Sequence, residues 1–501
     1  MSAKTPDFFD RTLANLSSMW RDLAERAGFA ERRIRDPGVS EDDAETIRTQ
    51  FRECLDAKGG EVSARARAAE LGGAYLGLST EGRKRFLKIL ATDFALDTNE
   101  LGRAVESYVA STDEVERLEA ERALRFAMLA PRVRLVTQFA SLPDGVKFLV
   151  DLRADLLGSA DGDAALESLD LDLKALLASW FDVGFLELRR ITWDSPASLL
   201  EKLSRYEAVH RVRSWGDLKN RLDADRRCYG FFHPRMPNEP LIFLEVALVR
   251  GMAGSIQAVL DERAPLQDPR QADTAIFYSI SNTQEGLRGI GFGSFLIKNV
   301  VDDLALEFPR LQTYATLSPI PGFRRWLGKL TLEDLNDYLA TDERVAASEA
   351  AHAADQGEDF RALLEQPRWH AKPEWTEILR APLSRLAAVY LLAERRGGKP
   401  LDPVARFHLG NGASVERLNW LADTSPKGLV ESAGMMVNYG YRSADIEANH
   451  ETYALGGPVA ASGALKRLVA GSPGATSRAS GIARLQDAVG LGRRRREQPG
   501  P

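Results

Sequence analysis

The part of the sequence that decides the fold lies past its middle, where residues 274–308 read TAIFYSISNTQEGLRGIGFGSFLIKNVVDDLALEF. Residues 274–280 have the aromatic and apolar character of a strand, and a loop with several glycines follows. From about Phe292 the pattern is that of an amphipathic helix, with apolar side chains at Phe295, Leu296, Val300, Leu304 and Phe308. The stretch therefore predicts a strand, a loop and a helix in succession, a unit typical of mixed α/β folds.

The loop of this unit is the first candidate site, made of Arg288, Gly289, Ile290, Gly291, Phe292, Gly293 and Ser294. Glycines let the backbone approach an anion closely, and the first amides of a helix have no partner within it, so the junction suits a phosphate. The loop is neither a Walker motif nor the Gly-x-Gly-x-x-Gly of a dinucleotide site. It spells Arg-x-x-Gly-x-Gly and resembles the coenzyme A loop of the acetyltransferase-like (GNAT) fold. A purely structural loop remains the alternative.

The second candidate follows the next predicted strand, in the run Thr316-Leu-Ser318-Pro-Ile-Pro-Gly-Phe323. Pro319 and Pro321 each fix φ at about −65°, so the backbone beyond Ser318 is a stiff turn that presents one hydroxyl at a defined point. The alternative is structural, because a serine before a proline is also a good N-cap for a helix.

The third candidate is the run Arg406-Phe-His408-Leu-Gly-Asn411-Gly412-Ala413. We expect residues 405–409 to form a strand in which His408 lies opposite the apolar face, and Asn411-Gly412 to end it in a turn. Imidazole exchanges a proton near neutral pH, which suits acid–base chemistry. A surface histidine, or one satisfied inside the core, is the alternative.

The order of patterns along the chain predicts an α+β protein of several domains. Residues 1–180 read as helix after helix, which favours an all-α bundle with a scaffolding or oligomerisation role. Residues 181–456 mix strands and helices and form the expected GNAT-like catalytic domain. Residues 457–501, rich in Gly, Ala and Arg, are the expected tail, partly disordered and including Arg493–Arg496.

The composition excludes several classes of protein. The 501 residues carry 66 Lys+Arg against 72 Asp+Glu, a net charge of −6, which gives no global attraction to nucleic acid or to an anionic membrane. Two cysteines, Cys54 and Cys228, exclude a disulfide framework and a Cys-rich metal module.

The most apolar stretch, residues 241–249, is interrupted by Glu245 and falls short of the ~20 residues of a membrane span. The first residues include acidic side chains and no apolar segment, which argues against a secretion or organelle-import signal. We expect a soluble, cytoplasmic protein with no nucleic-acid or membrane partner.

Several motifs of the sequence together resemble those of one known family. The loop at 288–294, the Ser318 run and the His408 run resemble the malonyl-CoA decarboxylase family, as do Phe277–Ser281, Asn419-Trp420 and Asn438-Tyr439-Gly-Tyr441. The resemblance implies that Ser318 and His408 are the catalytic pair and contact malonyl-CoA, and that residues 288–294 hold its coenzyme A moiety. It makes Asn411 and Tyr441 possible supporting residues. It also implies a homotetramer assembled through the helical half.

Two departures from the animal members bear on function. Gly291 stands where they carry an acidic residue, so no role of that acid is transferred to this chain. The chain ends Gln498-Pro-Gly-Pro501 and not in a peroxisomal tripeptide, which favours a cytosolic enzyme.

The implied chemistry fits these residues. A malonyl thioester loses CO2 while the electron pair moves into the thioester as an enolate, so the reaction requires no metal, pyridoxal or thiamine. The protein supplies a grip on coenzyme A, donors toward the enolate and a proton for the new carbanion carbon. We expect Ser318 to bind the carboxylate or relay a proton and His408 to donate the proton. The sequence leaves open which of them acts on which atom.

Two other functions remain open at this stage. A GNAT-type N-acyltransferase would require an amine-binding groove with its own base, which we do not find in the sequence. A non-catalytic acyl-CoA sensor is favoured only if Ser318 and His408 have structural roles.

Overall fold

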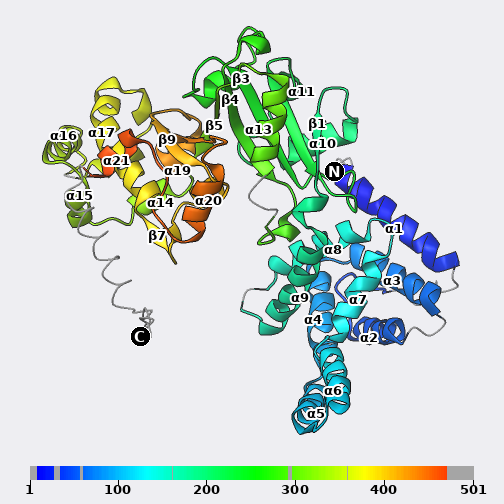
Figure 1. Cartoon of the computed structure of the whole chain (residues 1–501). Helices are drawn as coiled ribbons and strands as arrows, with labels where there is room; N and C mark the ends of the chain where they lie inside the picture. Colours follow the sequence, from blue (N-terminus) through cyan, green and yellow to red (C-terminus); the bar gives the residue numbers. More distant parts are fainter. Residues whose placement is uncertain are drawn as a thin grey trace, which may run out of the picture. The chain divides into compact units, whose positions relative to one another are not determined.

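The computed structural model describes residues 8–26, 34–56, 60–160, 162–291, 296–357 and 359–470 (Figure 1). The chain forms two compact units. The first consists of Met1–Glu187, Phe231–Ile242 and Asn282–Phe292. The second consists of Leu188–Gly230, Phe243–Ser281 and Gly293–Pro501. Three short segments of the predicted α/β half therefore belong to the first unit, namely residues 181–187, 231–242 and 282–292.

The first unit is helical. Its helices are α1 (Phe8–Arg26), α2 (Glu41–Leu55), α3 (Gly60–Leu76), α4 (Thr80–Asp93), α5 (Thr98–Ala110), α6 (Glu114–Ala127), α7 (Pro131–Ala140), α8 (Gly145–Leu157) and α9 (Ala164–Trp180). Short 3₁₀ turns at Val183–Phe185 (η1) and Glu285–Leu287 (η3) also belong to it. Many of the helices begin at a side chain that accepts hydrogen bonds from the first free backbone amides, namely Ser40, Ser79, Asp97, Asp113 and Asp163.

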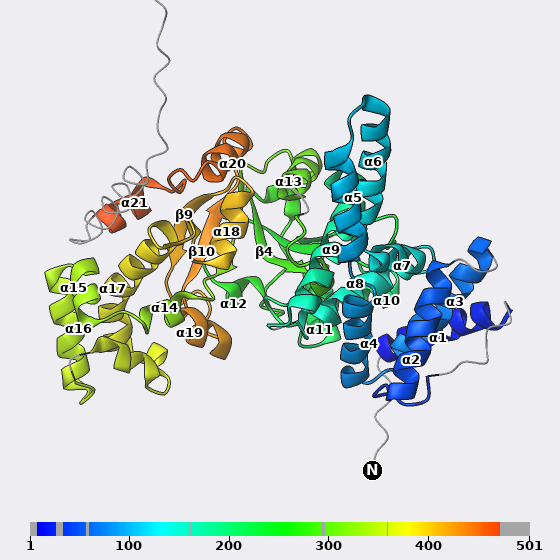
Figure 2. The same ribbon diagram turned by 90° about the horizontal axis from the view of Figure 1, so that it is seen from below.

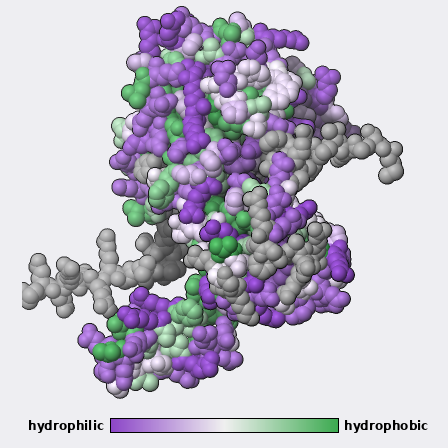
Figure 3. All heavy atoms as spheres, turned by 90° about the vertical axis from the view of Figure 1, so that its right-hand side faces the viewer, coloured by the Kyte–Doolittle hydropathy of each residue, from purple (hydrophilic) through white to green (hydrophobic). Residues whose placement is uncertain are grey.

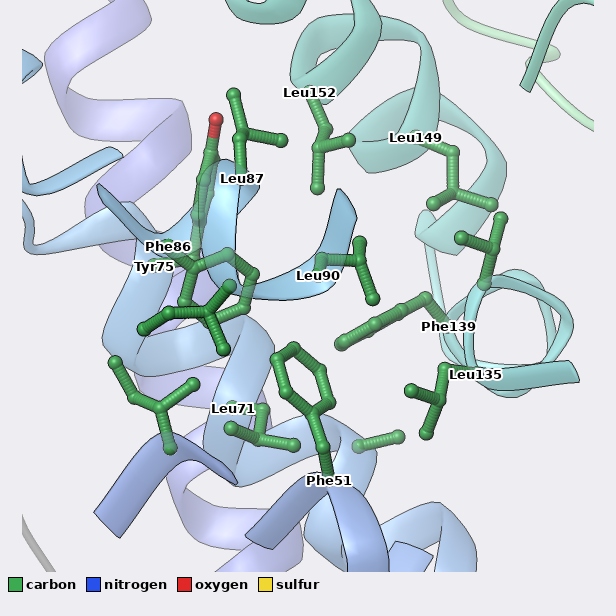
Figure 4. Packing of buried hydrophobic residues seen from close by; sticks show 14 of the residues in the cluster. Phe51, Leu71, Tyr75, Phe86, Leu87, Leu90, Leu135, Phe139, Leu149 and Leu152 are labelled. Atoms are coloured by element: carbon green, nitrogen blue, oxygen red, sulfur yellow. The ribbon is translucent and has the colours of Figure 1, made fainter. Parts of the chain in front are cut away.

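Aromatic side chains from three helices meet in the core of this unit (Figure 4). Phe86 of α4 packs edge-to-face on Phe51 of α2 and on Tyr75 of α3, with ring centroids 5.2 and 5.0 Å apart. Such pairs add about 0.5–1.5 kcal/mol each beyond the area they bury. Leucines of α4, α7 and α8 surround them, so the apolar stripe of each of these helices faces the core.

Helices α5 and α6 pack on each other and project from the other helices of the first unit (Figures 1 and 2). Both expose large apolar side chains, and in Figure 3 hydrophobic residues are visible on the lobe at the bottom of the view, which these helices form. The exposed residues are Val105, Tyr108 and Val109 of α5 and Val115, Leu118 and Phe126 of α6. We call these six residues the α5–α6 apolar face.

The second unit is built on a mixed sheet. Its strands lie in the order β1 (Glu187–Ile191), β2 (Arg226–Phe232), β3 (Ile242–Val249), β4 (Thr274–Asn282), β5 (Thr313–Thr316), β10 (Met436–Gly440) and β6 (Ser318–Pro319), and β9 (Ser414–Asn419) also pairs with β10. Strands β4 and β5 are parallel, from Thr274 opposite Thr313 to Phe277 opposite Thr316. Helix α13 (Leu296–Glu307) lies between these two strands in the chain, as the strand–loop–helix pattern predicts.

The two parallel strands part at the end of β5. The Leu317 amide still donates to the Phe277 carbonyl at 2.9 Å, but Ser318 then pairs with Val437 of β10. Strand β4 continues to Asn282 beyond the register it shares with β5. Ser318 therefore stands where the sheet opens.

Further helices surround the sheet within the second unit. They are α10 (Ala197–Tyr206), α11 (Trp215–Arg221), α12 (Ile256–Val259), α14 (Phe323–Leu327), α15 (Leu332–Tyr338), α16 (Thr341–Ala353), α17 (Pro373–Leu392), α18 (Pro403–Gly410), α19 (Pro426–Ser432), α20 (Ile446–Ala454) and α21 (Gly463–Ala470). A small hairpin of β7 (Arg395–Arg396) and β8 (Lys399–Pro400) precedes α18. None of the helices that the structure describes is long and apolar enough to cross a membrane.

The fold class is confirmed: a helical N-terminal part precedes a mixed α/β domain with the predicted strand–loop–helix–strand unit. The strand expected at 405–409 is wrong, because these residues lie in α18. The Asp402 side chain accepts a hydrogen bond from the Ala405 amide and Pro403 occupies the first helical turn, two features that start a helix.

Of the tail expected at 457–501, the structure describes residues 457–470, and these contact other parts of the second unit. Ala461 forms a β-bridge with Val415, and α21 packs against α17 and β9. The arginines 493–496 lie outside the described residues.

Candidate active site

Ser318 occupies a buried position in β6, with 6% of its surface exposed. The N-cap alternative for this serine is wrong, because the next helix, α14, begins only at Phe323 and has Gly322 at its N-cap position. Within the Pro319–Gly322 turn, a Cβ on Gly322 would lie 2.2 Å from the Tyr390 hydroxyl, so the turn requires glycine there. The Ser318 hydroxyl is therefore free for contacts other than helix capping.

His408 meets Ser318 across 90 positions of sequence. Helix α18 buries the imidazole, which is 3% exposed, and its Nε2 lies 3.1 Å from Ser318 Oγ. The other ring nitrogen, Nδ1, lies 2.8 Å from the Tyr441 hydroxyl. The Tyr439 ring stacks on the imidazole with centroids 4.5 Å apart. Both ring nitrogens are thus held by hydroxyl groups, and the ring plane is fixed by an aromatic neighbour.

Thr316, at the end of β5, completes the group. Ser318 Oγ donates to Thr316 Oγ1 at 2.8 Å, and the Tyr439 amide donates to the same oxygen at 3.1 Å. Thr316 is fully buried. We call Thr316, Ser318, His408 and Tyr441 the serine–histidine cluster. Thr316 was not identified from the sequence, because only the pairing of β10 with β5 and β6 brings the Tyr439 amide to it.

Burial keeps the serine–histidine cluster neutral. It lowers the pKa of His408 to about 3, because the cationic form loses its hydration inside the protein. It raises the pKa of Tyr441 well above the ordinary value for the same reason. At neutral pH the imidazole therefore has one proton, and the cluster offers uncharged donors and acceptors to a ligand.

Asn411 is not brought into contact with Ser318 or His408. It is the C-cap residue of α18, and its Nδ2 donates to the Phe407 carbonyl at 2.8 Å. Tyr441, the other possible supporting residue, does reach the imidazole. The two residues thus have different positions although both were singled out by the same resemblance.

Residues 288–291 of the glycine loop belong to the first unit and are described, whereas Phe292, Gly293 and Ser294 lie outside the described residues. The Arg288 side chain is exposed and pairs with Glu285 at 2.7 Å. Ile290 is buried, whereas a Cβ on Gly291 would meet open space. Gly289 has φ +78°, which favours glycine at this position.

Helices α8 and α9 contact this loop. Buried Arg153 of α8 donates through Nη1 to the carbonyls of Gly286 and Arg288, at 2.7 and 3.0 Å. A Cβ on Gly286 would lie 1.7 Å from the Val150 carbonyl oxygen, so loop and helix pack backbone to backbone. A Cβ on Gly289 would lie 3.4 Å from Nζ of Lys174, which places a cation beside the loop. Neither Arg153 nor Lys174 was identified from the sequence, because no sequence pattern indicates which helix packs against a distant loop.

A second buried polar group lies in the second unit, and we call Glu207, Asp217, Arg221 and Glu245 the charged cluster. Arg221 donates to Asp217 at 2.9 Å and to Glu245 at 3.0 Å. Glu207 accepts from the Ser279 hydroxyl at 2.7 Å. Burial, aided by the nearby Glu207 charge, raises the pKa of Glu245 to about 8 against the opposing effect of Arg221. In the ranges that the structure describes, no three His, Cys, Asp or Glu side chains are arranged to hold a metal ion.

Comparison with known proteins adds family matches over most of the chain. Residues 94–181 match the model described as malonyl-CoA decarboxylase N-terminal domain, and residues 184–479 match the C-terminal domain of the same family. The mitochondrial malonyl-CoA decarboxylase of Anser anser anser is 41% identical over 411 residues, which are 78% of this chain and 80% of that protein.

Solved structures agree with the sequence matches. The malonyl-CoA decarboxylase of Rhodopseudomonas palustris is 40% identical with a TM-score of 0.76, over 85% of this chain and 99% of that one. The enzyme of Agrobacterium vitis is 41% identical with a TM-score of 0.75, over 84% of this chain and 99% of that one.

Proposed function

The chain belongs to the malonyl-CoA decarboxylase family and is a decarboxylase, and on that premise we propose that Ser318 and His408 act together to convert malonyl-CoA into acetyl-CoA and CO2. The observation that carries the proposal is the 3.1 Å contact between Ser318 Oγ and His408 Nε2. Two buried residues 90 positions apart meet at the point where β4 and β5 separate. A hydroxyl and an imidazole at such a place are suited to bind a small acyl group and to move a proton.

The proposed reaction breaks the bond between the α carbon and the carboxylate. The electron pair of that bond moves into the thioester as an enolate, and CO2 leaves. A new C–H bond then forms with the proton of His408, and a proton from water restores the imidazole. Ser318 binds the carboxylate or relays a proton. Because the serine–histidine cluster is uncharged, it does not hold the carboxylate in an ion pair that would oppose its loss as neutral CO2.

The coenzyme A moiety has two proposed contacts. The loop at 288–294 binds the pyrophosphate through backbone amides, as its glycines suggest. Lys174 supplies a positive charge beside Gly289. Since Arg288 pairs with Glu285, Lys174 is the better placed of the two cations to meet a phosphate. Replacement of Lys174 by Met should raise KM for malonyl-CoA and leave kcat nearly unchanged, because the phosphate lies far from the reacting carbon.

An assay with malonyl-CoA as the sole substrate tests the reaction type. We expect equal amounts of CO2 and acetyl-CoA without any amine acceptor. A chelator arm in the same assay tests the prediction that no metal is required, and unchanged turnover is the expected result. Turnover that begins only after an amine is added would support an N-acyltransferase, and binding of malonyl-CoA without turnover would support an acyl-CoA sensor.

We also propose that the chain forms a homotetramer through the first unit. The support is the α5–α6 apolar face, whose Val109 and Phe126 are 77% and 61% exposed. A group of large exposed apolar side chains on one pair of packed helices is typical of a protein interface. Light scattering on Val109→Asp/Phe126→Asp should give a smaller species than the unmodified chain, whereas Leu455→Asp, an isolated exposed position, should not. An unmodified chain that is monomeric would contradict the proposal.

The cytoplasmic location stays a prediction of the sequence, since the relative from Anser anser anser is named as a mitochondrial protein. Immunoblots of cytosolic and organelle fractions test it, and recovery in the organelle fraction would contradict it.

A further inference from the structure

Thr316 has a hydroxyl group that the proposed reaction does not use, although it touches the reacting serine. It is the last residue of β5 and is 0% exposed. Its main chain is fixed as well, because its carbonyl accepts from Asn438 Nδ2 at 2.6 Å. A buried hydroxyl held in one place determines how a neighbouring hydroxyl can orient.

The donors around Thr316 Oγ1 set the direction of the hydrogen bonds. A peptide N–H can only donate, so the Tyr439 amide uses one lone pair of the oxygen at 3.1 Å. The Ser318 hydroxyl donates to the same oxygen at 2.8 Å. Since serine has a single hydroxyl proton, Ser318 has only lone pairs left for His408.

The direction of the remaining contacts follows. In the 3.1 Å contact between Ser318 Oγ and His408 Nε2, the imidazole must be the donor, so the ring proton lies on Nε2. In a neutral ring Nδ1 then has no proton and accepts from the Tyr441 hydroxyl at 2.8 Å. The hydrogen bonds therefore run in one direction, from Tyr441 through His408 and Ser318 to Thr316 Oγ1, which also accepts from the Tyr439 amide.

We propose that Thr316 is a positioning residue that holds the Ser318 hydroxyl away from His408 and thereby keeps His408 in the Nε2–H form. The inference rests on the proposed function, because it gives the tautomer that presents the proton of His408 on the side of Ser318. It also distinguishes this pair from a serine nucleophile with a histidine base, in which the serine donates its proton to the imidazole. Ser318 then donates its proton to Thr316 and not to His408, and it forms no acyl-enzyme.

Nitrogen-15 NMR of the imidazole tests the inference without reference to turnover. The chain is labelled with ¹⁵N-histidine, and the His408 signals are assigned as those missing from His408→Gln. We expect the proton on Nε2 in the unmodified chain. In Thr316→Val the Ser318 hydroxyl loses its acceptor and turns to His408, so the proton should move to Nδ1. Thr316→Ser keeps the acceptor oxygen and should restore the Nε2–H signal.

Kinetics supply the second readout. Thr316→Val should lower kcat by roughly 10²-fold, the lower end of the range for acid–base catalysis, with little change in KM. Thr316→Ser should recover most of that loss. A proton on Nδ1 in the unmodified chain would overturn the inference, and so would a Thr316→Val protein that keeps both the Nε2–H signal and full turnover.

The two proposals fail in distinguishable ways. Full turnover in His408→Gln would refute the catalytic pair but leave the tautomer spectrum of the unmodified chain valid. If Thr316→Val does not fold, the unmodified chain and Thr316→Ser still decide the inference, because both must show the proton on Nε2.

Discussion

The second unit contains two buried polar clusters that differ in charge. The serine–histidine cluster consists of hydroxyls and one neutral imidazole, whereas the charged cluster pairs Arg221 with Asp217 and Glu245. The buried charge of Arg221 requires a partner, and the Asp217 carboxylate, whose pKa is lowered, balances it at 2.9 Å. The Glu245 carboxyl, whose pKa is raised to about 8, accepts a second hydrogen bond from Arg221 at 3.0 Å. A neutral cluster can instead leave donors available to a ligand. We infer from this difference that the charged cluster stabilises the fold, and we propose the serine–histidine cluster as the catalytic group.

Ser318→Ala should distinguish the roles of the two clusters most clearly. Loss of the hydroxyl removes a contact to His408 and to the substrate, so kcat should fall by about 10²- to 10⁴-fold. The melting temperature should change little, because alanine fits the space and leaves no charge behind. Steady-state assays and calorimetry on the same preparation check both. A large drop in melting temperature with normal kcat would place Ser318 among the structural residues.

Arg221→Met tests the charged cluster in the opposite sense. It leaves the buried carboxyl groups of Asp217 and Glu245 without their guanidinium partner, which should cost about 3–5 kcal/mol of unfolding free energy. Arg190→Met, which removes a partly exposed pair with Glu307, should cost less than about 1 kcal/mol. Urea unfolding measures both. Equal costs in the two variants would contradict the structural role of the charged cluster.

Tyr441→Phe should have a smaller effect on activity than Ser318→Ala. It removes the hydroxyl 2.8 Å from His408 Nδ1 but leaves the contact of Nε2 with Ser318, so kcat should fall by roughly 10-fold. Tyr453→Phe removes a half-buried hydroxyl elsewhere in the second unit and should retain normal kcat. A Tyr441→Phe enzyme as active as Tyr453→Phe would show that Nδ1 requires no donor.

Glu245 should make stability depend on pH. Its pKa in the folded protein, about 8, lies above the value of 4.5 for an unperturbed glutamate, so the folded state binds more protons between these values. The unfolding free energy should therefore fall as pH rises through this window, by about 1.4 kcal/mol per pH unit at most. In Glu245→Gln the slope should be smaller. An identical slope in both proteins, measured by urea unfolding from pH 6 to 8, would contradict the shift.

The strand–loop–helix unit could be predicted from sequence because its signals are local. The aromatic and apolar character of residues 274–280 and the helical spacing after the loop need no distant partner, and β4 and α13 lie where they were expected. Residues 405–409 alternate, yet they form a helix. The Asp402-Pro403 start signal lies just upstream and outweighs a pattern of only five residues.

The site was predictable only in part. The stiff turn after Ser318 and the proton chemistry of His408 can be read from residue types, but their contact depends on how β6 and α18 are placed in the fold. Thr316 and Arg153 act through backbone groups of distant segments, and no single-sequence pattern marks such groups. Glu245 gave a partial signal, because it is the one charged residue in an apolar strand.

Turnover of His408→Asn with malonyl-CoA alone decides whether His408 is the proton donor. Coenzyme A binding is measured on the same protein by calorimetry, so that a loss of turnover is not mistaken for a loss of binding. We expect kcat to fall by at least about 10²-fold while coenzyme A binds as it does to the unmodified chain. Turnover within a few-fold of the unmodified chain would contradict the assignment of His408 as the proton donor.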